Sequence, residues 1–86
     1  TYLQDAQLRL NLIRAALQGA DNDGGRQAAH SLKGASANLG ANRLSSLCER
    51  MEHSAKAGQI AECGPLAAEI EAEFGHVKRE LQALIA

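Results

Sequence analysis

Residues 23–40 read Asp-Gly-Gly-Arg-Gln-Ala-Ala-His-Ser-Leu-Lys-Gly-Ala-Ser-Ala-Asn-Leu-Gly, and their periodicity predicts one helix from about Gly24 to Leu39. On a wheel that advances ~100° per residue from His30, the core-forming residues fall at roughly 140° to 260°. They are Ala28, Ala29, Leu32, Ala35, Ser36 and Leu39. His30 therefore lies in the middle of the face that points away from the core.

The residues around His30 are poor choices for an ordinary solvated helix face. Within about 80° of His30 the wheel places Arg26, Gln27, Lys33, Gly34, Ala37 and Asn38. A glycine inside a helix costs roughly 1 kcal/mol relative to alanine, and asparagine is also a weak helix former. Because this face carries so little side-chain bulk, we expect another protein to approach the imidazole closely. The predicted docking residues are Arg26, Gln27, Gly34, Ala37 and Asn38.

The chemistry of this face favours transfer of an anionic group to His30. A neutral imidazole is a good nucleophile near pH 7. Lys33 and Arg26, one turn to either side, supply the positive charge that phosphoryl oxygens prefer. No Asp or Glu lies within four residues of His30, so this helix provides no general base. We therefore expect a phosphoryl group to come from a partner that supplies its own catalytic residues and metal.

Three further segments with a helical period flank this one. They run from about Tyr2 to Leu17, from about Asn42 to Ala57 and from about Pro65 to Leu84. Seventeen of the 86 residues are Ala and 2% are aromatic, a composition typical of helices. The breaks between segments are short, which favours antiparallel neighbours. The sequence thus predicts a single all-α domain over residues 1–86, an antiparallel up-and-down four-helix bundle.

Each flanking segment has an apolar stripe for the core. The expected stripes are Leu3, Ala6, Leu10, Ile13 and Leu17; Leu44, Leu47, Cys48, Met51 and Ala55; and Leu66, Ile70, Phe74, Val77, Leu81 and Leu84. Asp21 or Asp23 is expected to cap the helix that carries His30, and Gly40 to end it. Leu8 and Leu12 lie off the first stripe, which indicates a second apolar contact on that helix.

Charge and composition exclude several classes of protein. A formal net charge of −1 argues against a nucleic-acid surface, and no apolar run is long enough to span a membrane. Two cysteines without a CxxC motif suggest free thiols in a reducing, cytoplasmic setting. The chain opens with Thr1 rather than Met and carries no signal segment, so we expect a piece of a longer protein. We expect this domain to be cytoplasmic without direct membrane contact, either free or attached as the cytoplasmic end of a membrane-anchored sensor kinase.

Other candidate residues favour ordinary structural roles. His53 lies among Glu49, Arg50 and Lys56 and is expected on a charged surface, and His76 is expected to be structural. The three histidines lie on different helices and no motif places two ligands on one face, so we predict no metal site. The last helix is expected to present a solvated acidic surface. Its members are Glu69, Glu71, Glu73 and Glu80.

The sequence from His30 to Gly40, preceded by Ala28-Ala29, closely resembles the signature of histidine-containing phosphotransfer (HPt) domains. Met51-Glu52 is similar to the apolar-Glu pair of the family's following helix, and the final helix with Phe74 also fits, so the resemblance covers nearly the whole chain. It implies a four-helix bundle without an active site of its own. Members of this family often carry a short additional N-terminal helix that caps the bundle. This chain is expected to lack that helix or to begin partway through it, and Leu8 and Leu12 would be the residues against which the helix packs.

The resemblance further implies a role in a phosphorelay. His30 would accept a phosphoryl group from the phosphoaspartate of a response-regulator receiver domain and pass it to a second receiver, and Lys33 would interact with that group. Gly34 would leave room for docking. Mg²⁺ would belong to the receiver, so no cofactor is expected on this domain. Such domains often form the C-terminal module of hybrid sensor kinases, and the isolated domain is expected to be a monomer.

Two other functions stay open. One is the dimerising, histidine-bearing domain of a sensor kinase, although in that class an acidic residue usually follows the histidine, whereas Ser31 follows His30. The other is a purely structural helical scaffold, against which the joint presence of His30, Lys33 and Gly34 argues.

Overall fold

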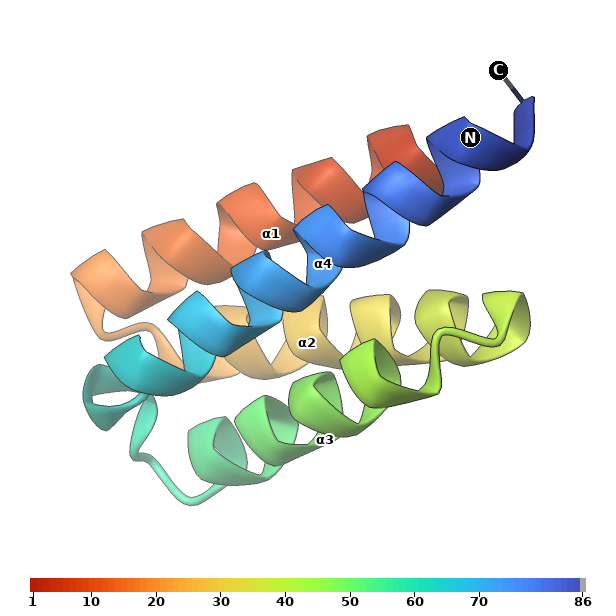
Figure 1. Cartoon of the computed structure of the whole chain (residues 1–86). Helices are drawn as coiled ribbons and strands as arrows, with labels where there is room; N and C mark the ends of the chain where they lie inside the picture. The colour runs from red at the N-terminus through yellow and green to blue at the C-terminus, as the bar shows by residue number, and fades with distance from the viewer. Residues whose placement is uncertain (86) are drawn as a thin grey trace.

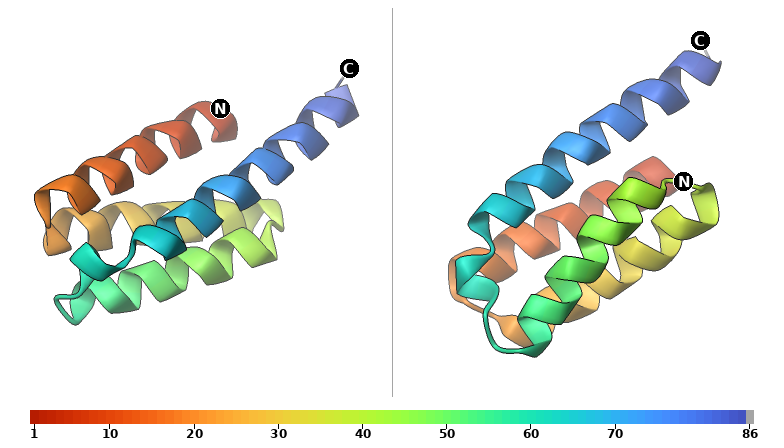
Figure 2. Two further views of the ribbon diagram at one scale, coloured as in Figure 1. Left: turned by 60° about the vertical axis from the view of Figure 1, so that its left-hand side comes forward. Right: turned by 60° about the horizontal axis from the view of Figure 1, so that its bottom comes forward.

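The computed structural model describes residues 1–85 as four α-helices and one short 3₁₀ helix (Figure 1). Their bounds are α1 Tyr2–Gly19, α2 Asn22–Leu39, α3 Asn42–Lys56, η1 Ile60–Glu62 and α4 Gly64–Ile85. Consecutive helices run antiparallel, so the predicted all-α up-and-down bundle is confirmed. The molecule is elongated, with extents of 41 × 20 × 19 Å, and α4 reaches beyond the other helices at one end (Figure 2).

Local sequence signals set the helix ends close to their predicted positions. Asp21 caps α2 by accepting a hydrogen bond from the backbone N–H of Gly24 at 3.0 Å, so this helix begins two residues earlier than predicted. At its other end Gly40 adopts a φ of 88°, the left-handed conformation that favours glycine. Thr1 caps α1 in a capping box with Gln4. The helix that carries His30 is therefore bounded by Asp21 at its N-terminal end and by Gly40 at its C-terminal end.

The 3₁₀ helix η1 was not predicted from the sequence. The side chain of Ile60 is fully buried, and its backbone N–H donates to Asn22 Oδ1 at 2.9 Å. A Cβ added at Gly25 would collide with Ile60 Cδ1, so the absent side chain at Gly25 makes room for the isoleucine. Ile60 thereby anchors the α3–α4 connection to the first turn of α2.

The buried face of α2 differs in part from the predicted one. Ala28, Ala29, Leu32 and Ser36 are buried as expected, but Ala35 is exposed and Leu39 is 42% exposed. The helix packs against both α1 and α3, and this rotates its buried face toward Ala29 and Ser36. The Ser36 hydroxyl is satisfied by a hydrogen bond with the Tyr2 hydroxyl at 2.9 Å.

The stripes on the other helices are largely confirmed. All five predicted core residues of α3 are buried, as are the central members of the stripes on α1 and α4. Leu84 is 81% exposed, contrary to prediction, because this part of α4 extends past the bundle. Leu8 and Leu12, which lie off the stripe, are 56% and 48% exposed.

The acidic residues of α4 lie on the surface as predicted, with Glu73 partly covered, and they also form ion pairs. Glu71 pairs with Arg14 of α1. Glu73 pairs with Arg43 of α3 at 3.3 Å, and Glu69 pairs with Arg50 of α3 at 3.7 Å. Exposed pairs of this kind contribute little stability each. These ion pairs nevertheless connect α4 to the two helices that it packs against, α1 and α3.

Candidate functional site

His30 lies midway along α2 on the face left free by α1 and α3. Its side chain is 63% exposed, which confirms that it points into solvent. The neighbouring Ala29 is fully buried and anchors this part of the helix in the core. The histidine is therefore accessible to a partner while its backbone is fixed by packing.

Glu52 of α3 connects His30 to Lys33. Its Oε2 lies 2.8 Å from His30 Nδ1, and its Oε1 lies 2.7 Å from Lys33 Nζ. Only 16% of the Glu52 side chain is exposed. The Ser45 hydroxyl donates to the carbonyl of Lys33 at 3.2 Å, which adds a second link between α2 and α3 beside the site. One carboxylate thus holds both polar side chains of α2.

The charges of this cluster support one another. The ion pair with Lys33 is the main cause that lowers the pKa of Glu52, burial opposes it, and the hydrogen bond with His30 lowers it further. The contact between Lys33 and Glu52 is likewise the main cause that raises the pKa of Lys33, against a smaller opposing effect of desolvation. Both groups are therefore charged at neutral pH.

The ionised state of Glu52 determines the tautomer of His30. A carboxylate can only accept hydrogen bonds, so the Nδ1 atom that contacts it must carry the proton. In a neutral ring the lone pair then resides on Nε2. Since Nδ1 is engaged by Glu52, the atom left to react with an approaching electrophile is Nε2.

The predicted docking residues surround His30 as expected. Gln27, Gly34, Ala37 and Asn38 are exposed, and a Cβ added at Gly34 would meet no atom within 4 Å. Neither the packing nor the φ angle of the chain requires glycine at position 34, so the fold itself does not explain this residue.

Asp23 restrains two of these docking residues. Its carboxylate accepts from Arg26 Nη2 at 2.9 Å and from Gln27 Nε2 at 3.0 Å. Arg26 is only partly exposed, so its charge is shared with Asp23 rather than presented freely as the sequence suggested.

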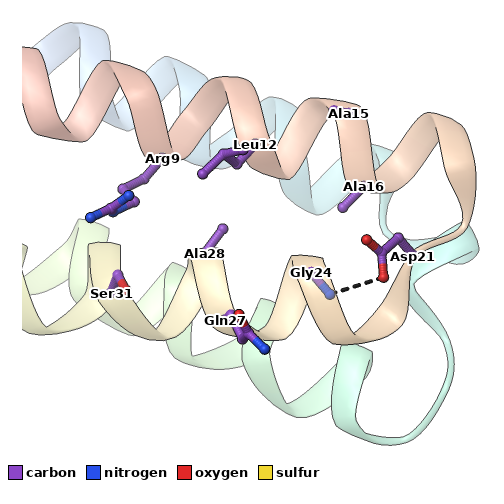
Figure 3. A pocket seen from close by; sticks show the side chains of 9 residues that line it. All are labelled: Arg9, Leu12, Ala15, Ala16, Asp21, Gly24, Gln27, Ala28 and Ser31. Atoms are coloured by element: carbon purple, nitrogen blue, oxygen red, sulfur yellow. Dashed lines mark hydrogen bonds between the residues drawn. The ribbon is translucent and has the colours of Figure 1, made fainter.

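A groove of about 370 Å³ runs between α1 and α2 beside this face (Figure 3). It is lined by Arg9, Leu12, Ala15, Ala16, Asp21, Gly24, Gln27, Ala28 and Ser31. Figure 3 shows Arg9 extending from α1 toward the level of Ser31, the residue next to His30. The groove therefore adjoins the candidate site on its α1 side.

Glu52 is the site residue to which sequence reasoning gave no role. It lies 22 positions from His30, beyond the reach of a helical wheel. The signal available in the sequence was the Met51-Glu52 pair. Met51 is buried in the core, and Glu52, the next residue on α3, reaches His30 on α2.

The other histidines are surface residues. His53 Nε2 lies 3.9 Å from Glu49 Oε1 and His76 Nε2 lies 2.9 Å from Glu80 Oε1, each within one helix. Across residues 1–85 no group of three His, Cys, Asp or Glu side chains is arranged to hold a metal ion. Within the same residues no helix combines the length and the apolar character needed to cross a membrane.

Comparisons with known proteins agree with this geometry. The family model described as Hpt domain matches residues 1–86. The crystal structure of histidine-containing phosphotransfer protein B (HptB) from Pseudomonas aeruginosa PAO1 is similar, with a TM-score of 0.88 and 38% sequence identity. The match covers 96% of this chain and 76% of that one. No match was found among curated proteins.

Proposed function

The chain belongs to the Hpt domain family, and from this premise we propose that His30 accepts a phosphoryl group from the phosphoaspartate of one receiver domain and passes it to the aspartate of another. Membership places the chain in phosphotransfer for two-component signalling, in which Hpt domains act as carriers rather than catalysts and interact with receiver domains. The identity of the acceptor residue and the route of transfer are the proposal.

The contact between His30 and Glu52 carries this proposal. Because Glu52 fixes the proton on Nδ1, the Nε2 lone pair points outward and can attack phosphorus. As the P–N bond forms, the P–O bond to the donor aspartate breaks and its electron pair stays on the leaving carboxylate. The phosphorylated ring becomes cationic, and the carboxylate of Glu52 beside Nδ1–H stabilises that charge, as an aspartate does for a catalytic histidine. The reverse sequence returns the group to a second aspartate.

Lys33 is suited to hold the transferred group. An ammonium has three N–H donors, and the contact with Glu52 Oε1 uses one of them. With 28% of its side chain exposed, Lys33 can direct another donor to the phosphoryl oxygens. The receiver would bring the aspartate and Mg²⁺, so the proposal gives this domain no cofactor. The monomeric state, the cytoplasmic location and attachment to a sensor kinase stay predictions.

Phosphoryl transfer from a panel of phosphorylated receiver domains tests the assignment of His30. We expect acid-labile label on the wild-type chain and none on His30→Gln, with unchanged helical circular dichroism. His53→Gln is the matched control, since His53 is also exposed and also lies beside a glutamate. Label retained on His30→Gln, or lost from His53→Gln, would assign the chemistry to another residue.

Gel filtration separates the relay from the dimerising sensor-kinase domain, and incubation with ATP alone tests for self-labelling. A relay domain has no nucleotide-dependent activity, so we expect the wild-type chain to stay unlabelled and to elute as a monomer in gel filtration. An obligate dimer, or self-labelling with ATP, would support the sensor-kinase function instead.

A further inference from the structure

We propose that Arg26 is a second cation for the transferred phosphoryl group, and that Asp23 holds Arg26 away from His30 until that group arrives. On phosphorylation the guanidinium exchanges one anionic partner, the Asp23 carboxylate, for another, the phosphoryl group on His30. This inference rests on the proposed function, because it takes His30 as the acceptor. It adds to that function a further phosphoryl-binding residue and a contact that regulates it.

Arg26 lies beside the acceptor on the same face of α2. It precedes His30 by four residues, a spacing that places the two Cβ atoms of a helical pair about 5 to 6 Å apart. Side chains of an α-helix lean toward its N-terminal end, so the imidazole lies over the turn from which Arg26 projects. Lys33 follows His30 by three residues and leans back toward it. The two cations therefore flank the imidazole along the helix axis.

The contact with Asp23 directs Arg26 away from His30. The Nη2 atom of Arg26 lies 2.9 Å from Oδ1 of Asp23, which belongs to the first turn of α2. The guanidinium is thus drawn toward the start of the helix, on the side opposite to the acceptor. The side chains of Arg26 and Asp23 are 36% and 72% exposed, so water reaches the pair. Such a hydrogen bond is one that a stronger anion can replace.

The exchange leaves no carboxylate buried without a partner. Asp23 binds Arg26 through Oδ1 and accepts from Gln27 Nε2 through Oδ2 at 3.0 Å, so Gln27 stays in place when Arg26 leaves. The first turn of α2 also favours a negative charge. Lys33 is less free to move, because its departure would leave the charge of Glu52, whose side chain is only 16% exposed, without its cation. Arg26 is therefore the cation that can turn fully toward the phosphoryl group.

The strengths of the two contacts favour the exchange. An exposed ion pair within one helix contributes little. A phosphoryl group brings about two negative charges and three acceptor oxygens, and a guanidinium can bind two of these oxygens at once. Arg26 acts through hydrogen bonds alone and gives up no proton. The P–N bond still forms at Nε2 of His30 while the P–O bond to the donor breaks, and its electron pair stays on the leaving oxygen.

Labelling by phosphoramidate, which transfers a phosphoryl group to imidazole without a protein partner, tests the role of Arg26. We expect Arg26→Gln to label His30 about tenfold more slowly than wild type, with a smaller loss in Arg26→Lys. Asp23→Asn frees the guanidinium and should label His30 about threefold faster. The matched control is Arg14→Gln, since Arg14 is also an exposed arginine paired with a carboxylate, and it should match wild type. Labelling of His53 in the same samples should not change.

The double variant separates an exchange of partners from a simple effect of charge. Without the guanidinium, Asp23→Asn should have no effect, so the rate of the double variant should equal that of Arg26→Gln. Equal acceleration by Asp23→Asn in both backgrounds would show that Asp23 acts through its charge alone, and would overturn the exchange.

A direct readout is the ¹⁵N NMR signal of the Arg26 guanidinium, which should shift when His30 is phosphorylated in the wild-type chain. An unchanged signal, or a wild-type labelling rate in Arg26→Gln, would contradict the proposal. A loss seen with receivers but not with phosphoramidate would make Arg26 a docking residue instead. If no receiver labels the wild-type chain, the proposed relay fails, and labelling by phosphoramidate still decides the role of Arg26.

Discussion

At the scale of single residues, His30, Lys33 and Glu52 form a short chain of contacts across two helices. Glu52 accepts a hydrogen bond from His30 through Oε2 and forms an ion pair with Lys33 through Oε1, and this sharing gives each of them a defined orientation. The nucleophile is therefore prepared before a partner arrives, because its reactive nitrogen is already selected. Such preorganisation reduces the rearrangement needed when the phosphoryl group is transferred.

The dependence of stability on pH tests the ion pair of Glu52. The pKa of Glu52 is lowered by folding, so its contribution is fully present above its ordinary value of 4.5 and is lost as the pH falls through the lower folded-state value. We expect Glu52→Gln to reduce the free energy of unfolding by about 1 kcal/mol at neutral pH. Urea titrations should show this difference shrinking as the pH falls below about 4.5. A difference that stays constant or grows in acid would contradict the ion pair.

Substitution of Gly34 separates folding from docking. Alanine fits the open space there and is a better helix former, so Gly34→Ala should raise the free energy of unfolding by up to about 1 kcal/mol. Gly75→Ala in α4 should do the same, since its Cβ would make only an ordinary contact with Arg79 at 3.5 Å. Gly34→Gln should slow transfer from a receiver about tenfold or more by obstructing its approach, whereas Gly75→Ala should not slow it. Transfer at the wild-type rate in Gly34→Gln would show that the bare surface has no role in docking.

At the scale of elements, η1 connects the base of the bundle to the helix that carries the site. Ile60 fills the space above Gly25 and its backbone is held by Asn22, so the α3–α4 connection is packed rather than loose. This contact secures the first turn of α2, two turns before His30. The position of the histidine thus depends in part on a segment far from it in sequence.

Truncation of Ile60 measures this support. Removal of a fully buried isoleucine side chain leaves a cavity, so we expect Ile60→Ala to lower the free energy of unfolding by about 2 to 5 kcal/mol. Ile85→Ala removes the same atoms from a side chain that is 83% exposed and should change it by no more than about 0.5 kcal/mol. Equal effects of the two substitutions in thermal unfolding would show that η1 does not anchor α2.

At the scale of the whole molecule, periodicity predicts the helices because each one buries a single stripe. The core of α3 and the outward position of His30 could both be deduced from spacing alone. The exposure of Ala35 and Leu39 could not be deduced in this way, because the face that α2 buries depends on how α1 and α3 both pack against it. The role of Glu52 and the groove beside Arg9 also depend on contacts between helices, which a wheel drawn for one helix does not contain.

The position of the phosphoryl group on the imidazole tests the central claim most directly. After transfer from a receiver, long-range ¹H–¹⁵N correlation and ³¹P NMR of the labelled chain identify the modified nitrogen. The contacts around His30 predict phosphorus on its Nε2, with a proton retained on Nδ1 beside Glu52. Phosphorus on Nδ1 of His30, or on His53 or His76, would contradict the account.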